Sequence, residues 1–519
     1  MATHISAHTI TRNPASVPED SLRKFCYSDL FGPTDPDLGS DVTTFTQEQP
    51  SRSIEKQSTS SFQLRYTINS LPTETLAAIF DECRRTLTAR DGATLLSVSR
   101  VSRRWRDVAI HSPFLWNRIY FSTSRRCAAQ ASLCLERSRN CPLDLIVQAP
   151  DKCTLHQRSL LGKWVNRLAS NACRWRSIDL HFYNLDGLVC FMLSSTKAPH
   201  LTHVRIVLER SANSTRLPVS SGIKTDVLSH LELKGVSFEN FRPVDGLSLR
   251  RLTSLSLAEV VATLPSTQFI TLLKEAPELE QLSLLGDVVQ MGGNAPCTIH
   301  IPSLKSLTLS PGSLFNFKHL CNALTTPAVE ELSLHHLLTE SMEAFVESLH
   351  FSDPKYPILQ SLELRDPIAF PDATKSFLTE FPSIRQLTLV AYRNDAHLPV
   401  LDALAAVSDA QEESPDVSTC TCEELASMAA WGDFDQLDFD RAVHFCSPPK
   451  NKLSILLLRD LETLGVTPLS EAVFKSLKKV IGNRMVAGSP IKTLRSSTYD
   501  GLPLGAGSWL RERVSLGSI

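Results

Sequence analysis

The 519-residue sequence has no apolar run of the roughly 18 residues that a membrane-spanning helix needs. It also lacks the basic start and short apolar stretch of a secretory signal, and its 13 cysteines are scattered and odd in number. These absences predict an intracellular protein with reduced thiols, located in the cytoplasm, the nucleus or both, that does not associate with membranes.

An excess of charge of one sign is also missing. The 53 Lys and Arg against 55 Asp and Glu leave a net charge of -2, which gives no general attraction to nucleic acid. No nucleophile elbow, zinc-protease motif or phosphate-binding loop is present, and the closest cysteine pair, Cys420-x-Cys422, lacks further ligands at zinc spacing. We therefore expect no nucleic-acid binding, no cofactor, no metal site and no catalytic residue, and a protein that is not an enzyme.

The character of the sequence changes several times along the chain. Residues 1–65 are rich in Ser, Thr, Pro and Gln and predict a disordered tail. A helical pattern then gives way to a repeating one. The expected parts are a helical module at 66–121, a repeat array at 122–400, an insertion at 401–450, the last repeats at 451–498 and a loose tail at 499–519.

The insertion is set apart by its charge. Residues 401–440 hold eleven Asp or Glu and no Lys or Arg, with Trp431 and Phe434 among the carboxylates. Such a composition predicts an acidic, disordered insertion. The alternative is a short recognition segment that folds on a basic partner.

The helical module begins at Leu71. Leu76, Ile79, Phe80 and Cys83 are spaced i, i+3, i+4, i+7, which places them on one stripe of a helix. A second helix is expected from Thr94 to about Ile110. About fifty residues are too few for a self-sufficient core, so the module is predicted to lean on the rest of the chain or on another protein. The alternative is two helices of an ordinary globular core.

Three parts of this module carry a family resemblance. They are Leu71-Pro72-x-Glu74-x-Leu76-x-x-Ile79-Phe80, then Ser102-Arg103-Arg104-Trp105, and Ser112-Pro113-Phe114-Leu115-Trp116. Together they resemble an F-box, in the form common in large fungal families, although the family often has Cys at the position of Ser102. The resemblance implies a three-helix fold that binds the Skp-type adaptor of a cullin-RING ubiquitin ligase, and a cullin through it. The adaptor-binding residues that it implies are Leu71, Pro72, Leu76, Ile79, Phe80 and Trp105.

A Leu-x-Leu pattern recurs through the centre of the chain at intervals of 24 to 30 residues. The pairs begin at Ile178, Val204, Leu231, Leu255, Leu282, Leu307, Leu332, Leu362 and Leu387. Leucine-rich repeats have a period of about 20 to 29 residues and a similar strand pattern. The pattern predicts an α/β repeat fold, in which a three-helix F-box precedes an irregular leucine-rich-repeat solenoid, a horseshoe with an inner parallel sheet.

Alternation along each strand favours this fold over a doubly wound α/β domain, whose strands are buried on both faces and read as continuous apolar runs. The residue between two leucines should point away from the core, toward the concave surface. Candidate target-binding residues are therefore Asp179, Arg205, Glu232 and Glu363. Further strands are expected at 142–147, 453–458 and 491–494, with a helix at 471–486.

Three functions remain open at this point. The chain is expected to be a substrate receptor of a ubiquitin ligase, holding an unknown target protein on its repeats. A second hypothesis is an F-box interaction protein with no role in ubiquitylation. A third is a repeat scaffold whose F-box-like segment only caps the array.

Overall fold

The computed structural model divides the chain into two compact units. Unit 1 comprises residues up to Trp116 together with Ser124–Arg137, and unit 2 comprises Asn117–Thr123 and the chain from Ser138 onward. The structure describes residues 68–86, 93–149, 154–182, 197–209, 225–236, 248–260, 263–291, 298–350, 355–368, 370–392, 396–405, 457–497, 502 and 505–518. The tail expected at 1–65 and residues 406–450 of the expected insertion lie outside them.

Unit 1 is built of short helices, and the three that were expected are present. The elements are η3 (Ile68–Ser70), α1 (Thr73–Thr86), α2 (Ala93–Val101), α3 (Arg103–His111), η4 (Pro113–Trp116) and α4 (Arg125–Arg137). Helices α1, α2 and α3 contact one another, and α4 packs against η4. The module therefore leans on a fourth helix from its own chain, which was not predicted.

The prediction of a single helix from Thr94 to Ile110 is wrong, because the helical conformation is interrupted at Ser102. Ser102 has extended backbone angles, and its hydroxyl accepts a hydrogen bond from the Trp105 backbone N–H at 3.1 Å. Serine is among the best residues at a helix N-cap, since it satisfies an otherwise unpaired N–H group. The hydroxyl at this position therefore starts α3 as a separate helix.

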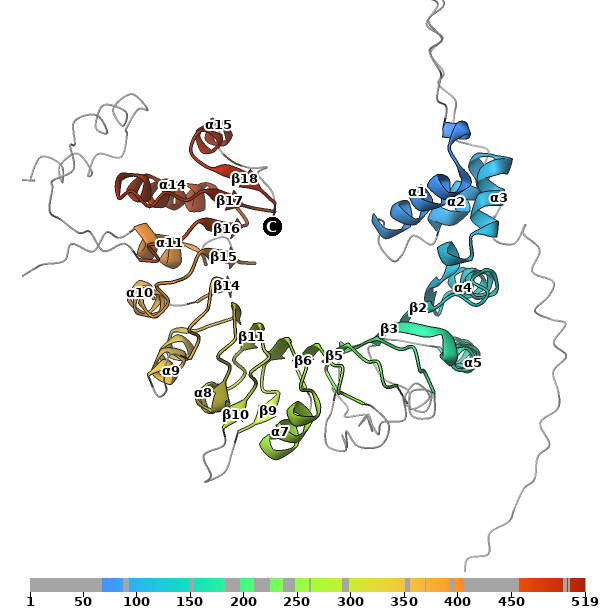
Figure 1. Ribbon diagram of the computed structural model, residues 1–519, viewed down its shortest axis with the longest axis horizontal. Helices are drawn as coiled ribbons and strands as arrows, with labels where there is room; N and C mark the ends of the chain where they lie inside the picture. Colours follow the sequence, from blue (N-terminus) through green and yellow to red (C-terminus); the bar gives the residue numbers. More distant parts are fainter. Residues whose placement is uncertain are drawn as a thin grey trace, which may run out of the picture. The chain divides into compact units, whose positions relative to one another are not determined.

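Unit 2 contains a parallel sheet whose 14 described strands follow one another in chain order (Figure 1). The strands are β1 (Arg118–Ser122), β2 (Leu143–Ala149), β3 (Trp175–Phe182), β4 (His203–Leu208), β5 (His230–Lys234), β6 (Ser254–Ala258), β8 (Gln281–Leu285), β11 (Ser306–Ser310), β13 (Glu331–His335), β14 (Ser361–Arg365), β15 (Gln386–Val390), β16 (Thr463–Thr467), β17 (Thr493–Arg495) and β18 (Ser515–Gly517). All nine Leu-x-Leu pairs lie in these strands, so the expected parallel sheet is present.

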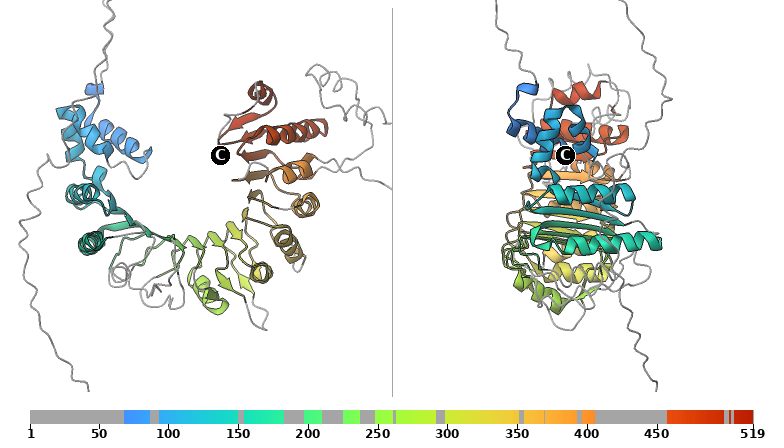
Figure 2. Two further views of the ribbon diagram at one scale, coloured as in Figure 1. Left: turned by 180° about the vertical axis from the view of Figure 1, so that it is seen from behind. Right: turned by 90° about the vertical axis from the view of Figure 1, so that its right-hand side faces the viewer.

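The helices of unit 2 gather along one side of the sheet, as the left view of Figure 2 shows. They are α5 (Leu155–Ala169), α7 (Ser266–Glu275), α8 (Leu314–Ala323), α9 (Thr339–Leu349), α10 (Pro371–Thr379), α11 (Leu398–Ala405) and α14 (Glu471–Val486), and the short helix α15 (Ala506–Arg511) lies between β17 and β18. Small strand pairs, β7 (Leu264–Pro265) with β9 (Val289–Gln290) and β10 (Ile299–His300) with β12 (Leu324–Thr325), add to this layer. A doubly wound domain would have helices on both faces.

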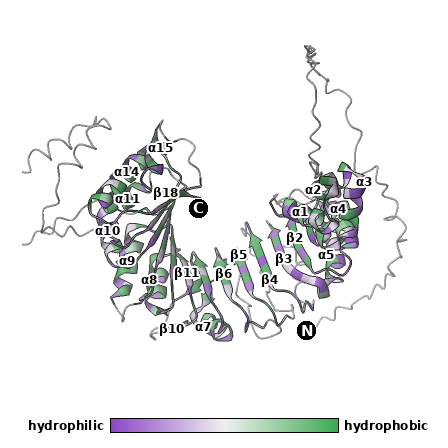
Figure 3. Cartoon of the chain, turned by 45° about the horizontal axis from the view of Figure 1, so that its top comes forward, coloured by the Kyte–Doolittle hydropathy of each residue, from purple (hydrophilic) through white to green (hydrophobic). Residues whose placement is uncertain are grey.

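The core of unit 2 lies between the sheet and this helical layer. The paired leucines Leu282 and Leu284 of β8 and Leu307 and Leu309 of β11 are fully buried, and each is in register with its counterpart on the next strand. Figure 3 shows the resulting alternation of hydrophobic and hydrophilic residues along the strands. Burying a leucine side chain contributes about 1.5 to 3 kcal/mol, so each added repeat stabilises the unit. The residues between the leucines are left on the other side of the sheet, which we call the open face.

Three boundaries differ from the expected ones. Residues 118–122 form the first strand of the sheet instead of the end of the helical module. Of the strand expected at 453–458, residues 453–456 lie outside the described residues, whereas Leu457 and Leu458 are buried within a turn and β16 begins at Thr463. The last residues do not form a loose tail throughout, since α15 and β18 continue the helix and strand pattern there. By contrast, the helix at 471–486 has the predicted ends.

Candidate functional site

Helix α1 carries three of the six expected adaptor-binding residues, and the structure divides the six into buried and exposed ones. Leu76 and Phe80 are 0% and 1% exposed. The Phe80 ring lies 5.0 Å from the Trp105 ring between centroids, so it joins α1 to α3. These two residues form the core of unit 1, and an external protein cannot contact them while the unit is folded.

The second group faces solvent. Ile79 is 37% exposed and Pro72 is exposed, whereas Leu71 is half-buried and its carbonyl accepts a hydrogen bond from Arg104. Leu76 and Phe80 are buried in the core, whereas Ile79 lies toward solvent. The core therefore contacts only one side of the stripe that the spacing of these residues predicts. The predicted contact is thus reduced to Ile79 and the start of α1, with Leu76, Phe80 and Trp105 holding them in place.

Sequence reasoning missed other exposed apolar side chains of unit 1. Ile68, Val101 and Phe114 are each more exposed than Ile79. Val101 is the last residue of α2, and the break at Ser102 separates it from the apolar residues of α3. The sequence signal that could have revealed this is the serine itself, which caps the following helix.

The end of the module is anchored by Trp116. Its indole N–H donates to the Ala109 carbonyl at 2.7 Å, and the Arg137 guanidinium lies 4.5 Å from the ring centre. Burial also raises the pKa of the nearby Cys134 thiol to about 12, so this cysteine stays neutral and behaves as a core residue. These contacts fix η4 and α4 against α3 and give unit 1 a defined surface.

On the open face of unit 2, three of the four predicted target-binding residues are brought together. Asp179, Arg205 and Glu232 occupy matching positions on β3, β4 and β5. The Arg205 guanidinium lies 3.0 Å from the Glu232 carboxylate and 3.8 Å from that of Asp179, which also contacts His181 at 2.9 Å. Glu363 lies in the same row on β14, with its own partner Arg365, but four strands lie between it and Glu232.

Between these two charged regions, the row carries only hydroxyl side chains. The residues are Ser256, Ser283, Thr308 and Ser333. On the first strands, sequence reasoning missed a stacked pair of imidazoles, His203 and His230, whose ring centres are 4.2 Å apart. A bound protein would therefore meet two charged patches with a neutral, hydrogen-bonding stretch between them.

His335 adds a pH-sensitive group to this face. Burial lowers its pKa from 6.5 to about 4, helped by the charges of Arg365 and His336. Between these two values the unfolded chain binds a proton that the folded chain does not, so the free energy of unfolding falls as pH is lowered from 6.5 toward 4. Replacing His335 with Gln should reduce that loss by about 1 to 2 kcal/mol, because the ring is partly solvated.

The measurement is the free energy of unfolding in urea of the parent and of the His335 variant at pH 7, 5.5 and 4.5. The exposed His300→Gln variant is the control and should keep the pH dependence of the parent. An unchanged pH dependence in the His335 variant would show that this imidazole does not couple protonation to folding.

The comparison with known families decides the nature of unit 1. Residues 68–122 match the F-box-like family. This segment includes helices α1 to α3, η4 and strand β1, so the F-box-like segment extends through the first strand of the sheet of unit 2. The resemblance expected from the sequence is confirmed over these residues.

A solved structure, that of the Rad7 and Elc1 complex in yeast, is similar at a TM-score of 0.30 and 10% identity, over 86% of this chain and 92% of that chain. A likeness at this level is too distant to place a function. A search of curated proteins found no match. Among the described residues, no helix is both long and apolar enough to cross a bilayer. In the same part of the chain, His, Cys, Asp and Glu residues do not gather in threes as a metal ion would require.

Proposed function

We propose that this chain is a non-catalytic substrate receptor of a cullin-RING ubiquitin ligase of the SCF type, acting in the cytoplasm, the nucleus or both. The F-box-like segment would bind a Skp-type adaptor, and a cullin through it. The observation that carries the proposal is the family match at 68–122, together with Ile79 left exposed on a helix whose other large apolar residues, Leu76 and Phe80, are buried. Such a side chain is available to a partner without unfolding the segment.

Unit 2 would hold the target protein. We interpret its sheet as an irregular leucine-rich-repeat horseshoe, because strands follow in chain order, helices lie on one side and the Leu-x-Leu period is 24 to 30 residues. The open face would then be the concave surface, where Asp179, Arg205 and Glu232 offer charged groups for recognition. The chain would contribute proximity, raising the concentration of a bound target near the ubiquitin-loaded enzyme.

Co-purification tests adaptor binding directly. The full chain, expressed with a Skp-type adaptor, should recover it in a stoichiometric complex, and deletion of residues 71–109 should abolish recovery. If the full chain recovers no adaptor, the F-box-like segment only caps the repeats and the proposal is wrong.

A second measurement separates a substrate receptor from an interaction scaffold, the alternative function for which the same segment and sheet would serve. Proteins captured by the full chain in cells should accumulate, with longer half-lives, when residues 71–109 are deleted. Captured proteins with unchanged half-lives would favour the scaffold without ubiquitylation.

A further inference from the structure

The last strands of unit 2 share an edge that is basic and partly apolar. Strands β16, β17 and β18 are parallel and in register, so their first residues lie side by side. Lys492 precedes β17 at this edge, and a short turn links it to the end of α14 at Val486. We define the basic edge as Lys479, Met485, Val486, Lys492, Arg511 and Arg513.

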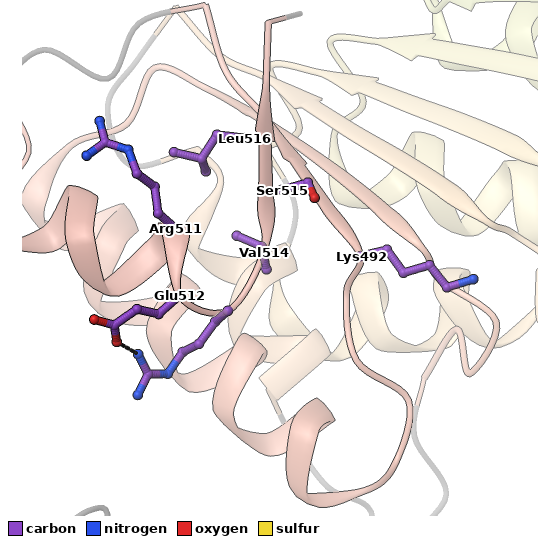
Figure 4. Close-up of a pocket in the computed structure, with 7 residues that line it drawn as sticks. Lys492, Arg511, Glu512, Val514, Ser515 and Leu516 are labelled. Carbon is purple, nitrogen blue, oxygen red and sulfur yellow. Dashed lines mark hydrogen bonds and ion pairs between the residues drawn. The ribbon is translucent and has the colours of Figure 1, made fainter.

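Three cations of the basic edge, Lys492, Arg511 and Arg513, line a shallow hollow of about 600 Å³, and Glu512 lines it as well. Figure 4 shows Lys492 and Arg511 on opposite sides of Val514 and Ser515. Lys492 contacts Glu462 at 2.7 Å and is still 67% exposed, while Arg513 pairs with Glu512 at 3.0 Å. Arg511 is exposed and has no ion-pair partner among the residues that the structure describes. The hollow therefore offers positive charge to a ligand.

Two apolar side chains are exposed at the end of α14, on the stretch of chain that leads to Lys492. Met485 is 46% and Val486 is 74% exposed, although most apolar residues of this helix are buried. Lys479, Asn483 and Val486 are spaced i, i+4, i+7 and so share one side of the helix. Apolar surface beside cations fits a ligand that is both acidic and aromatic.

A segment of this chain with that composition is flanked at both ends by residues that are bonded to α14. The Asn483 side-chain N–H donates to the Ala405 carbonyl at 2.7 Å, and the Arg484 guanidinium donates to the Leu457 carbonyl at 3.0 Å. Two successive residues of α14 thus hold the two ends of residues 406–456. Any position within these 51 residues is tethered to the basic edge.

The sequence of the segment complements the edge in charge and in apolar content. Residues 406–440 contain ten Asp or Glu and no Lys or Arg. Within 431–440 the sequence alternates acids with large apolar residues, and these are Trp431, Phe434, Leu437 and Phe439 among Asp433, Asp435, Asp438 and Asp440. Neither the F-box-like segment nor the open face makes use of this stretch.

We propose that residues 431–440 of this chain bind the basic edge, with carboxylates at Lys479, Lys492 and Arg511 and apolar side chains on Met485 and Val486. The tether makes this association intramolecular, and a short linker supplies an effective concentration on the order of millimolar. A weak interface is then enough to keep the edge occupied. An acidic segment of another protein would have to displace the chain's own.

Carbodiimide cross-linking of the full chain tests the proposal, because the reagent joins a carboxylate to a lysine amine in direct contact. Peptide mapping should find amides between Asp433–Asp440 and Lys479 or Lys492. Their yield should exceed that at the exposed control Lys274 by about tenfold and fall at 1 M salt, where the screening length is about 3 Å. The yield should not depend on protein concentration.

Charge reversal supplies the matched variants. Lys492→Glu with Arg511→Glu should lower the yield at Lys479 by about tenfold, and adding Asp435→Lys with Asp438→Lys should restore it. Equal yields at Lys479 and Lys274 would overturn the proposal. Yields that rise with protein concentration would also overturn it, because the occupant would then be a second copy of the chain.

Discussion

Replacing Ile79 with Asp is expected to lower the affinity for a Skp-type adaptor by about 100-fold, which corresponds to roughly 2.7 kcal/mol, while the chain stays folded. Ile79 is 37% exposed, so a carboxylate is hydrated there in the free chain. Only a bound adaptor would bury that charge, and burying an unpaired charge is costly. The measurement is a titration of the purified full-length variant with adaptor.

Two further variants make this result specific. Val101→Asp alters a more exposed apolar residue of unit 1 that the F-box resemblance does not place in the contact, and it should bind like the parent. Phe80→Asp should unfold unit 1, because Phe80 is buried against Trp105. Full adaptor affinity in the Ile79 variant would contradict the assigned contact.

Replacing Arg484 with Met is expected to destabilise the end of the sheet by about 3 to 5 kcal/mol. Arg484 is fully buried, and burial lowers the pKa of its guanidinium. Its amino groups donate to the carbonyls of Leu457, Leu458 and Arg459 at 3.0, 2.9 and 3.1 Å. Methionine would leave these carbonyls without donors, and each unpaired buried group costs about 1 to 3 kcal/mol.

The backbone of Leu458 adds to the effect. Its φ of 53° lies in the left-handed region, which costs a residue other than glycine roughly 1 to 2 kcal/mol. The hydrogen bonds from Arg484 hold the turn in this conformation. Hydrogen exchange should therefore quicken across β16 and β17 in the Arg484 variant. The exposed Arg459→Met variant should change stability by less than about 0.5 kcal/mol, and equal protection in the parent and the Arg484 variant would rule out the anchoring role.

The strands could be predicted from the sequence because their signal is local. In every Leu-x-Leu pair, the alternation that marks a strand is also the alternation that the sheet needs to bury one side. Asp179, Arg205 and Glu232 were placed on the open face for this reason, and the register brings them into contact. For the strands that carry the Leu-x-Leu pairs, the recurring period indicated which ones become neighbours, since each repeat packs on the next.

The rest depends on contacts that a single sequence does not contain. Leu76, Ile79 and Phe80 look equivalent on a helical stripe, and only the packing of α3 on α1 separates the buried from the exposed. In the sequence, Arg484 looks like a solvated residue of an amphipathic helix. Its carbonyl partners follow a long insertion, so the sequence pattern does not reveal the contact with them. Leu457 and Leu458 were assigned to the end of a strand but lie in a turn, because a buried turn can be as apolar as a strand.

Strands β15 and β16 are hydrogen-bonded neighbours, although α11 and residues 406–456 lie between them in the sequence. Closing a longer loop between two fixed points costs little more free energy than closing a shorter one, because the entropic cost of closure grows only with the logarithm of loop length. A fluorescent or affinity domain could therefore be grafted between Ala405 and Leu457 without disturbing the hydrogen bonds between β15 and β16. The same junction offers a way to follow the protein in cells with both of its termini left unmodified.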